Sequence, residues 1–298
     1  MPSTTTLPVH EAATIAMDTV VKIQVVTDQD EAKVRYALQR ALTWFATVEQ
    51  ACSRFDPNSE LRQLLARPGE PVKVSPVLFE AVRFAVHLAR ATDGVFDPTV
   101  GLRLEQHGFN RHYITGQVLT SPDVDTSAAF RDVRFGPRRT ITLRRPVVLD
   151  LGAVAKGLAI DLASCELLAF ENFCVEAGGD LYAAGCNADG QPWRIGVQDP
   201  RDLDALAATL DISNRAVCTS GDYERKSRDG TGHHLLDPRT GQSAQGLASV
   251  TVVAPTAMAA DGLATAAFIL GLEDGVRFLQ QSDVDGVFIT SSGAMHRT

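Results

Sequence analysis

Residues 249–270 read SVTVVAPTAMAADGLATAAFIL, and this stretch predicts a strand that leads directly into a helix. Residues 249–254 are rich in β-branched side chains, which is typical of a buried strand. Pro255 ends the strand, and Thr256 is suited to cap the helix that follows. Apolar surface on this helix is supplied by Ala259, Leu263, Ala266, Ala267 and Leu270.

Asp261 and Thr265 lie four residues apart in the predicted helix. At about 100° per residue, this spacing places both side chains on one helical face. A carboxylate and a hydroxyl on a rigid element suit Mg²⁺, which binds few protein oxygens and leaves room for substrate phosphates. A structural interpretation stays open, in which Asp261 complements the helix dipole and Thr265 bonds back to a carbonyl one turn earlier.

Composition narrows the class of protein. The chain has 298 residues, of which 45% are hydrophobic and 21% charged, as in ordinary soluble globular proteins. Its formal net charge of −8 disfavours a nucleic-acid partner. The sequence contains no signal-peptide pattern and no apolar run of about 20 residues, so we expect no membrane segment and a cytoplasmic location. The five cysteines lack C-x-x-C spacing and favour neither a disulfide framework nor a zinc site.

A second strand-to-helix connection contains a lysine. Residues 146–151 predict a strand, followed by a glycine-containing turn over 152–157 and a helix over 158–170. Lys156 lies near the expected start of that helix, where backbone N–H groups can bind phosphate. The P-loop pattern G-x-x-x-x-G-K-[ST] is absent. Lys156 is therefore either a phosphate contact or a side chain that reaches water from an apolar surface.

Other turn-rich segments hold groups that could contact a ligand. Residues 94–101 and 177–180 combine glycines with a carboxylate, and both compositions also suit structural turns. Phe55 could stack on a ring or fill a gap in the core. His234 precedes an Asp-Pro turn, and it could be an acid, a base or a buried core residue.

Eight short motifs follow one another along the chain. They are MDT (17–19), SRF with SEL (53–55 and 59–61), GVFDPTVG (94–101), DLGAVAKG (150–157), AGGD (177–180), TSGDY (219–223), HLLDPRTG (234–241) and DGLAT (261–265). In this order and rough spacing they resemble the ApbE family, the FAD:protein FMN transferases or flavin transferases. The resemblance covers essentially residues 17–290.

The resemblance implies an α+β fold related to the T-fold. We expect a single unit of mixed sheets and helices over residues 17–298, with two similar halves as an open alternative. Residues 1–16 are expected to form a flexible N-terminal extension.

The resemblance also implies an activity. The implied enzyme depends on Mg²⁺, cleaves FAD, joins FMN through its phosphate to a threonine or serine of an acceptor flavoprotein, and releases AMP. The implied Mg²⁺ ligands are Asp261, Thr265 and the backbone carbonyl of Ala153. Asp261 and His234 are the implied catalytic residues, with His234 as the candidate base for the acceptor hydroxyl. The implied FAD contacts are Met17, Phe55, Phe96, Asp97, Thr99, Lys156, Ala159, Gly178, Gly179 and Asp180.

Two positions depart from the common family pattern. Asp18 stands where the family usually has glycine. Phe55 keeps an aromatic face at a position that varies among tyrosine, phenylalanine and asparagine, but it lacks a hydroxyl. Two other functions stay open: a Mg²⁺-dependent FAD pyrophosphatase, in which water replaces the acceptor hydroxyl, and a non-catalytic FAD-binding protein.

Overall fold

A computed structural model describes residues 7–112, 115–121, 124–125, 127–202, 204–227, 230 and 232–298. Within this part of the chain, an eight-stranded antiparallel sheet forms the frame of the molecule. Its strands, in spatial order, are β1 (Val9–Ala16), β2 (Thr19–Val26), β6 (Asn172–Ala177), β7 (Asp180–Ala184), β10 (Arg215–Gly221), β11 (Leu247–Ala254), β12 (Asp285–Thr290) and β13 (Met295–Arg297).

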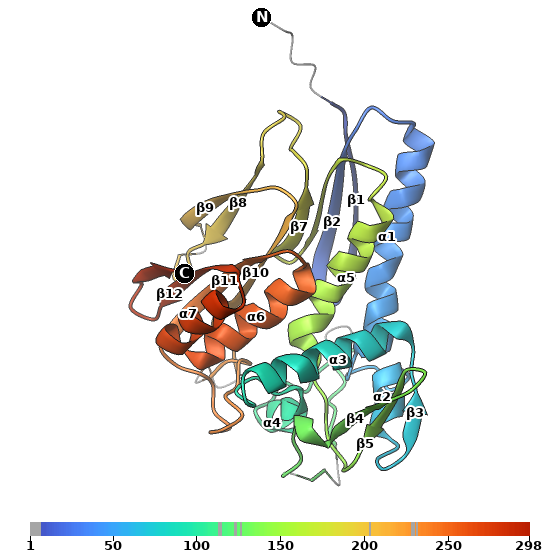
Figure 1. Cartoon of the computed structure of the whole chain (residues 1–298), viewed down its shortest axis with the longest axis vertical. Coiled ribbons are helices and arrows are strands. Elements are labelled where there is room, and N and C mark those ends of the chain that lie inside the picture. Colours follow the sequence, from blue (N-terminus) through green and yellow to red (C-terminus); the bar gives the residue numbers. More distant parts are fainter. Residues whose placement is uncertain are drawn as a thin grey trace, which may run out of the picture.

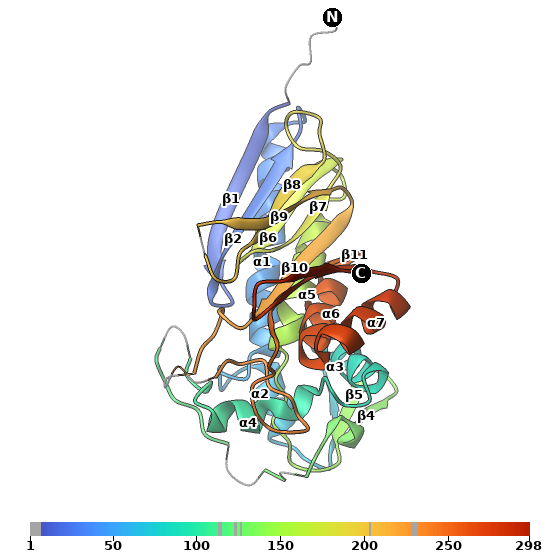
Figure 2. The ribbon, with the colours of Figure 1, turned by 90° about the vertical axis from the view of Figure 1, so that its left-hand side faces the viewer.

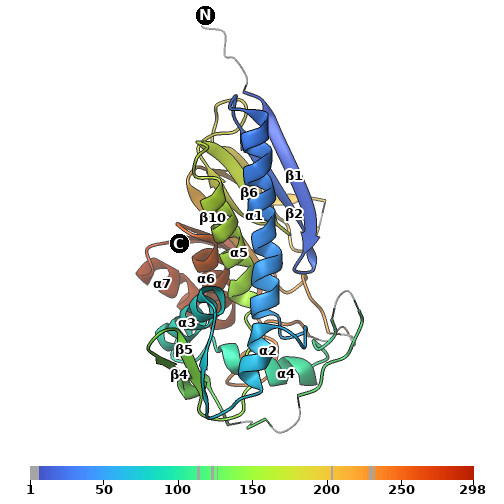
Figure 3. The same ribbon diagram turned by 90° about the vertical axis from the view of Figure 1, so that its right-hand side faces the viewer.

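Helices cover one face of this sheet (Figure 1, Figure 3). The long helix α1 (Glu31–Cys52) packs on β1 and β2, and it also contacts α5 (Gly152–Glu166). Next along the sheet, α6 (Ala257–Leu270) packs on β10 and β11, and α7 (Leu272–Gln281) packs on β12. Buried residues on these elements belong to one hydrophobic core, because each helix presents an apolar face to the sheet.

The opposite face of the sheet carries a small hairpin, which Figure 2 shows in front of β6 and β7. Its strands are β8 (Trp193–Gln198) and β9 (Leu206–Ile212). Trp193 and Ile212 belong to a second buried cluster, together with Leu181 and Val217 of the main sheet.

The chain order of the elements repeats within the main sheet. The hairpin β1–β2 is followed by helices and by the hairpin β6–β7, and the hairpin β10–β11 is followed by α6, α7 and β12–β13. Each set contributes four neighbouring strands. This order agrees with the expected α+β class and with two similar halves.

The remaining elements form a layer beyond one end of the main sheet (Figure 1). They comprise the helices α2 (Glu60–Leu65), α3 (Pro76–Ala91) and α4 (Gly101–Gln106), the 3₁₀ helices η1 (Pro98–Val100) and η2 (Phe130–Asp132), and a three-stranded sheet of β3 (Pro71–Lys73), β5 (Thr140–Leu143) and β4 (Val133–Gly136). In the described part of the chain, no helix combines the length and the apolar character needed to cross a membrane.

Residues 9–16 belong to the sheet, so the expectation of a flexible extension up to residue 16 is wrong for this segment. β1 pairs with β2 along its whole length, from Val9 opposite Val26 to Ala16 opposite Thr19. Its sequence, VHEAATIA, has a weak strand signal, and the pairing with β2 decides its conformation. Residues 1–6 of the expected extension lie outside the described residues.

The expected strand over residues 146–151 is not part of a sheet. Its backbone bonds to the short helices η1 and α4 instead: the Val148 carbonyl accepts from the Gly101 N–H at 3.1 Å, and the Asp150 N–H donates to the Pro98 carbonyl at 2.8 Å. The helix that follows begins at Gly152 rather than at residue 158. Lys156 therefore lies within α5, one turn from its N-terminus.

Candidate active site

A cavity of about 710 Å³ lies where the β1–β2 turn, the β6–β7 turn and the end of β10 meet the layer of loops and short helices. This volume is in the range of small-molecule sites, ~300–1,000 Å³. The predicted site residues that line the cavity are Met17, Phe55, Phe96, Asp97, Ala153, Lys156, Gly178, His234, Asp261 and Thr265. Four predicted FAD contacts are not among its lining residues, namely Thr99, Ala159, Gly179 and Asp180.

A close approach of α5 and α6 positions Asp261. A Cβ atom on Gly157 would lie 2.4 Å from the Ala257 carbonyl oxygen, so this contact requires glycine. The Gly157 N–H donates to Asp261 Oδ2 at 3.2 Å. Further along α5, Asp161 accepts from the N–H groups of Ala257 and Met258, at 2.7 and 3.0 Å, and holds the first turn of α6.

Asp261 and Thr265 lie on the same wall of the cavity, as their spacing predicts. Each is 7% exposed. Thr265 Oγ1 is 2.9 Å from Ser220 Oγ, so it is held by β10. Burial, and then the neighbouring charge of Asp180, raises the pKa of Asp261 to about 7. A buried carboxylate with a raised pKa favours binding of a cation.

Lys156 points to a carboxylate rather than to open water. Its Nζ lies 2.7 Å from Asp180 Oδ2, and the Asp180 side chain is only 3% exposed. Burial opposes the lysine charge, but Asp180 and then Asp261 outweigh burial and raise the pKa of Lys156. Asp180 Oδ1 accepts from the Thr219 N–H at 2.9 Å. Asp180 thus reaches the site through Lys156, although it does not line the cavity.

The residues on this wall fit Mg²⁺. Asp261 and Asp180 bring two carboxylates, while Lys156 brings one ammonium group, so one negative charge is left when both acids are ionised. The Asp261 carboxylate, the Thr265 hydroxyl and the Ala153 carbonyl are hard oxygen donors. Among the described residues, no group of three or more His, Cys, Asp or Glu is placed to hold a metal.

Two turns also line the cavity. Gly178, in the β6–β7 turn, has φ 58°, and a Cβ there would lie 2.3 Å from Thr19 Oγ1. Met17 and Asp18, in the β1–β2 turn, also have positive φ, of 53° and 64°. This left-handed conformation favours glycine but is tolerated by aspartate. The carboxylate of Asp18 in turn lies 3.7 Å from the guanidinium of Arg225.

The loop after α3 is braced by its own polar groups. Asp97 Oδ1 accepts from both the N–H and the hydroxyl of Thr99, at 2.8 and 2.7 Å. Asp97 Oδ2 accepts from the Phe130 N–H at 3.2 Å. Thr99 is therefore bonded within the loop, whereas Phe96 and Asp97 reach the cavity.

His234 lies on the cavity wall with its Nδ1 buried and without a hydrogen-bond partner in the described residues. Its ring meets the edge of Phe109, with 6.4 Å between ring centroids. Burial, and then the charge of Arg225, lowers the pKa of His234 to about 3. The imidazole is therefore neutral at neutral pH.

Sequence reasoning did not single out several residues at this site. Ser220 lies within the TSGDY motif, so that motif could have indicated it. Arg54 and Asp150 form an ion pair at 2.5 Å, 96 positions apart in the sequence. No local pattern indicates a pair with that separation.

Comparison with known proteins places this arrangement in a family. The sequence profile of the ApbE family matches residues 17–288. The FAD:protein FMN transferase of Treponema pallidum is 31% identical over 305 residues, covering 94% of this chain and 84% of that protein. The FAD:protein FMN transferase of Haemophilus influenzae is 29% identical over 264 residues, covering 81% and 74%.

Solved structures agree over nearly the whole chain. The ApbE protein of Thermotoga maritima is 33% identical, with a TM-score of 0.86 and coverage of 98% of this chain and 97% of that one. The flavin transferase ApbE of Vibrio cholerae is 26% identical, with a TM-score of 0.81 and coverage of 98% and 97%. From the match over residues 17–288, we conclude that the chain belongs to the ApbE family.

Proposed function

We propose that this chain is a Mg²⁺-dependent FAD:protein FMN transferase. An acceptor threonine or serine oxygen attacks the FMN phosphorus of FAD, the bond from that phosphorus to the AMP phosphate breaks, and AMP leaves. The observation that carries the proposal is the cavity wall on which Asp261, Thr265 and Lys156 gather, in a chain of this family. Cleaving a pyrophosphate depends mainly on positioning and charge neutralisation, which this wall can supply.

Asp261, Thr265 and the Ala153 carbonyl are the proposed Mg²⁺ ligands. When bound, Mg²⁺ supplies charge neutralisation on phosphate oxygens. The hydrogen bonds from Gly157 to Asp261 and between Ser220 and Thr265 orient the protein ligands beforehand. This fixed orientation supports a metal site, because hydrogen bonds to the ligating side chains set their geometry.

Lys156 is the proposed cationic contact to the pyrophosphate. Its side chain is 27% exposed and lies on the cavity wall, so it can meet a ligand while keeping Asp180 as a partner. Its raised pKa keeps it charged at neutral pH. A phosphate group that approaches Lys156 therefore meets a fixed ammonium group.

The remaining wall is proposed to hold the rest of FAD. Phe55 and Phe96 offer aromatic surface for a planar ring, and Met17 and Gly178 line the same cavity. We keep Asp97, Thr99, Ala159, Gly179 and Asp180 as residues of this binding region, with Thr99 and Asp180 acting through hydrogen bonds and ion pairs to lining residues.

His234 is the proposed base for the acceptor hydroxyl. A neutral imidazole on the cavity wall can take the proton released when the oxygen bonds to phosphorus. Its low pKa makes it a weak base in the free protein. Negative charge from a bound pyrophosphate would raise that pKa and strengthen the base.

We also propose one domain, which begins with β1 rather than at residue 17, and a cytoplasmic location. The larger of the two buried clusters extends from Ala16 to Phe288, which supports one folding unit. All five cysteines are free thiols, which supports a reducing compartment.

The test is to incubate the protein with FAD and Mg²⁺, with and without a candidate acceptor flavoprotein. We expect AMP release coupled to an increase in acceptor mass, and no increase when the acceptor hydroxyl residue is changed to alanine. AMP and free FMN in equal amounts, without acceptor modification, would identify a pyrophosphatase. FAD binding without AMP would identify a non-catalytic flavin-binding protein.

A further inference from the structure

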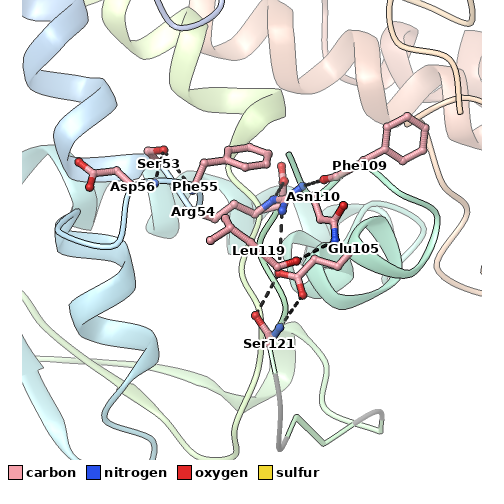
Figure 4. A network of polar contacts seen from close by, with 10 residues as sticks. Ser53, Arg54, Phe55, Asp56, Glu105, Phe109, Asn110, Leu119 and Ser121 are labelled. Carbon is pink, nitrogen blue, oxygen red and sulfur yellow. Dashed lines mark hydrogen bonds and ion pairs between the residues drawn. The ribbon is translucent and has the colours of Figure 1, made fainter. Parts of the chain in front are cut away.

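Arg54 is a buried cation beside the cavity that the proposed reaction does not use. It is 4% exposed. Its Nε donates to Asp150 Oδ2 at 2.5 Å, its Nη2 donates to the Phe109 carbonyl, and its Nη1 lies 3.9 Å from Glu105 Oε1. Figure 4 shows this guanidinium between Phe55, Phe109 and Glu105. Two separate segments, one containing Glu105 and Phe109 and the other Asp150, are therefore joined to the loop that follows α1.

The partners of Arg54 are themselves held in place. Glu105 accepts from the Ser121 N–H at 2.9 Å and from the Ser121 hydroxyl at 3.0 Å. Asp150 Oδ1 accepts from the Gly152 N–H at 2.8 Å, at the start of α5. Because two carboxylates face the guanidinium, its charge is already neutralised. Arg54 is thus poorly suited to bind a phosphate group.

The guanidinium has a second contact, with Phe55. Its carbon lies 4.1 Å from the centroid of the Phe55 ring, within the range of a cation–π contact. Phe55 is half-buried and lines the cavity. The ring is therefore supported by a planar group that hydrogen bonds and ion pairs hold in one orientation.

We propose that Arg54 is a positioning residue for flavin binding, which holds the Phe55 ring in the orientation that stacks on the isoalloxazine ring of FAD. This inference rests on the proposed function, because it takes FAD as the ligand. An arginine is needed for this role, since a lysine has neither the planar surface nor the fork of donors that joins Asp150 to Phe109.

The test measures FAD affinity without turnover, by quenching of flavin fluorescence in EDTA. We expect Arg54→Lys to weaken FAD binding roughly tenfold and to reduce the quenching at saturation, because the ring is no longer held for stacking. AMP release at saturating FAD and Mg²⁺ should change less, so that the loss falls mainly on KM. Thermal melting checks that the variant is folded.

Arg131→Lys is the matched control. The Arg131 guanidinium lies 4.6 Å from the Phe130 ring centroid and pairs with Asp93 at 2.8 Å, but Arg131 does not line the cavity. Losing this similar contact should leave FAD affinity unchanged. Equal losses in the Arg54 and Arg131 variants would overturn the inference.

A double-mutant cycle separates positioning from general destabilisation. Phe55→Leu should weaken FAD binding, and adding Arg54→Lys to it should cause little further loss, because Arg54 acts through the ring. Additive losses, or unchanged affinity in folded Arg54→Lys, would overturn the inference. If Arg54→Lys does not fold, the near-isosteric Glu105→Gln takes its place in the cycle. Glu105→Gln should weaken FAD binding less than Arg54→Lys does, and it should have no effect in the Phe55→Leu background. Failure of the wild-type protein to bind FAD would instead contradict the proposed function itself.

Discussion

At the scale of single residues, the ion pair of Lys156 and Asp180 links stability to ligand binding. The Asp180 carboxylate is buried, and Lys156 lies 2.7 Å from it. Removing the lysine therefore leaves an uncompensated buried charge, which typically costs about 3–5 kcal/mol. A loss of activity in such a variant can come from the lost contact with phosphate or from lost stability, and these two causes can be separated.

We expect Lys156→Met to reduce AMP release from FAD roughly 10²-fold, the effect of one well-aimed electrostatic donor. The same change should lower the melting temperature. In the double variant Lys156→Met/Asp180→Asn, the buried charge is gone, so the melting temperature should recover while activity stays low. Full recovery of activity in the double variant would show that Lys156 only neutralises Asp180.

At the scale of elements, the contact of α5 with α6 is fixed by a buried carboxylate. Asp161 accepts from two N–H groups at the first turn of α6. Burial nevertheless raises the pKa of Asp161 from 3.8 to about 6. Because the folded state holds this proton more tightly than the unfolded state, the contribution of Asp161 to stability is lost as the pH rises through about 6.

This linkage predicts a pH-dependent difference between two proteins. The free energy of unfolding of Asp161→Asn, relative to wild type, should increase between pH 4 and pH 8 by up to about 3 kcal/mol. Asparagine also loses one of the two accepted hydrogen bonds, but that cost does not vary with pH. Denaturant unfolding at several pH values measures the difference. A constant difference across this range would mean that Asp161 does not titrate as its burial implies.

The elements that the sequence predicts well are those with local signals. The β-branched run before Pro255 forms β11, and Thr256 caps α6 by accepting from the Ala259 N–H. By contrast, β1 has a weak strand signal, and the apolar run over residues 146–151 bonds to the short helices η1 and α4. β1 pairs with β2, which follows it directly, whereas residues 146–151 bond to Pro98 and Gly101; in both cases the pattern of the segment itself carries no information about its partner.

In the site, too, the features with a local signal are predicted and those that depend on distant packing are not. The four-residue spacing of Asp261 and Thr265 suffices to place both on one helical face. The pairing of Lys156 with Asp180, and of Arg54 with Asp150, depends on how α5 and the loop after α1 pack. The family motifs brought most of these residues together as candidates, but they did not indicate which acid pairs with which base.

At the scale of the whole molecule, the cavity is built where both similar halves of the sheet contribute. The β1–β2 and β6–β7 turns come from one set of strands, while β10 and α6 come from the other. The proposed metal ligands Asp261 and Thr265 therefore come from one set of elements, and Met17 and Gly178 come from the other. A cavity lined by elements from both sets suits an extended ligand with chemically different ends, as FAD is.

The central claim is that Asp261 holds the metal with which FAD is cleaved in this cavity. The most direct test compares AMP release from FAD by wild type and Asp261→Asn across a range of Mg²⁺ concentrations, with melting temperatures recorded in EDTA. We predict a loss of turnover of at least roughly 10²-fold at every Mg²⁺ concentration. The melting temperature should be unchanged or higher, because a buried carboxylate with a raised pKa is removed. A folded Asp261→Asn protein that releases AMP with wild-type dependence on Mg²⁺ would contradict the claim.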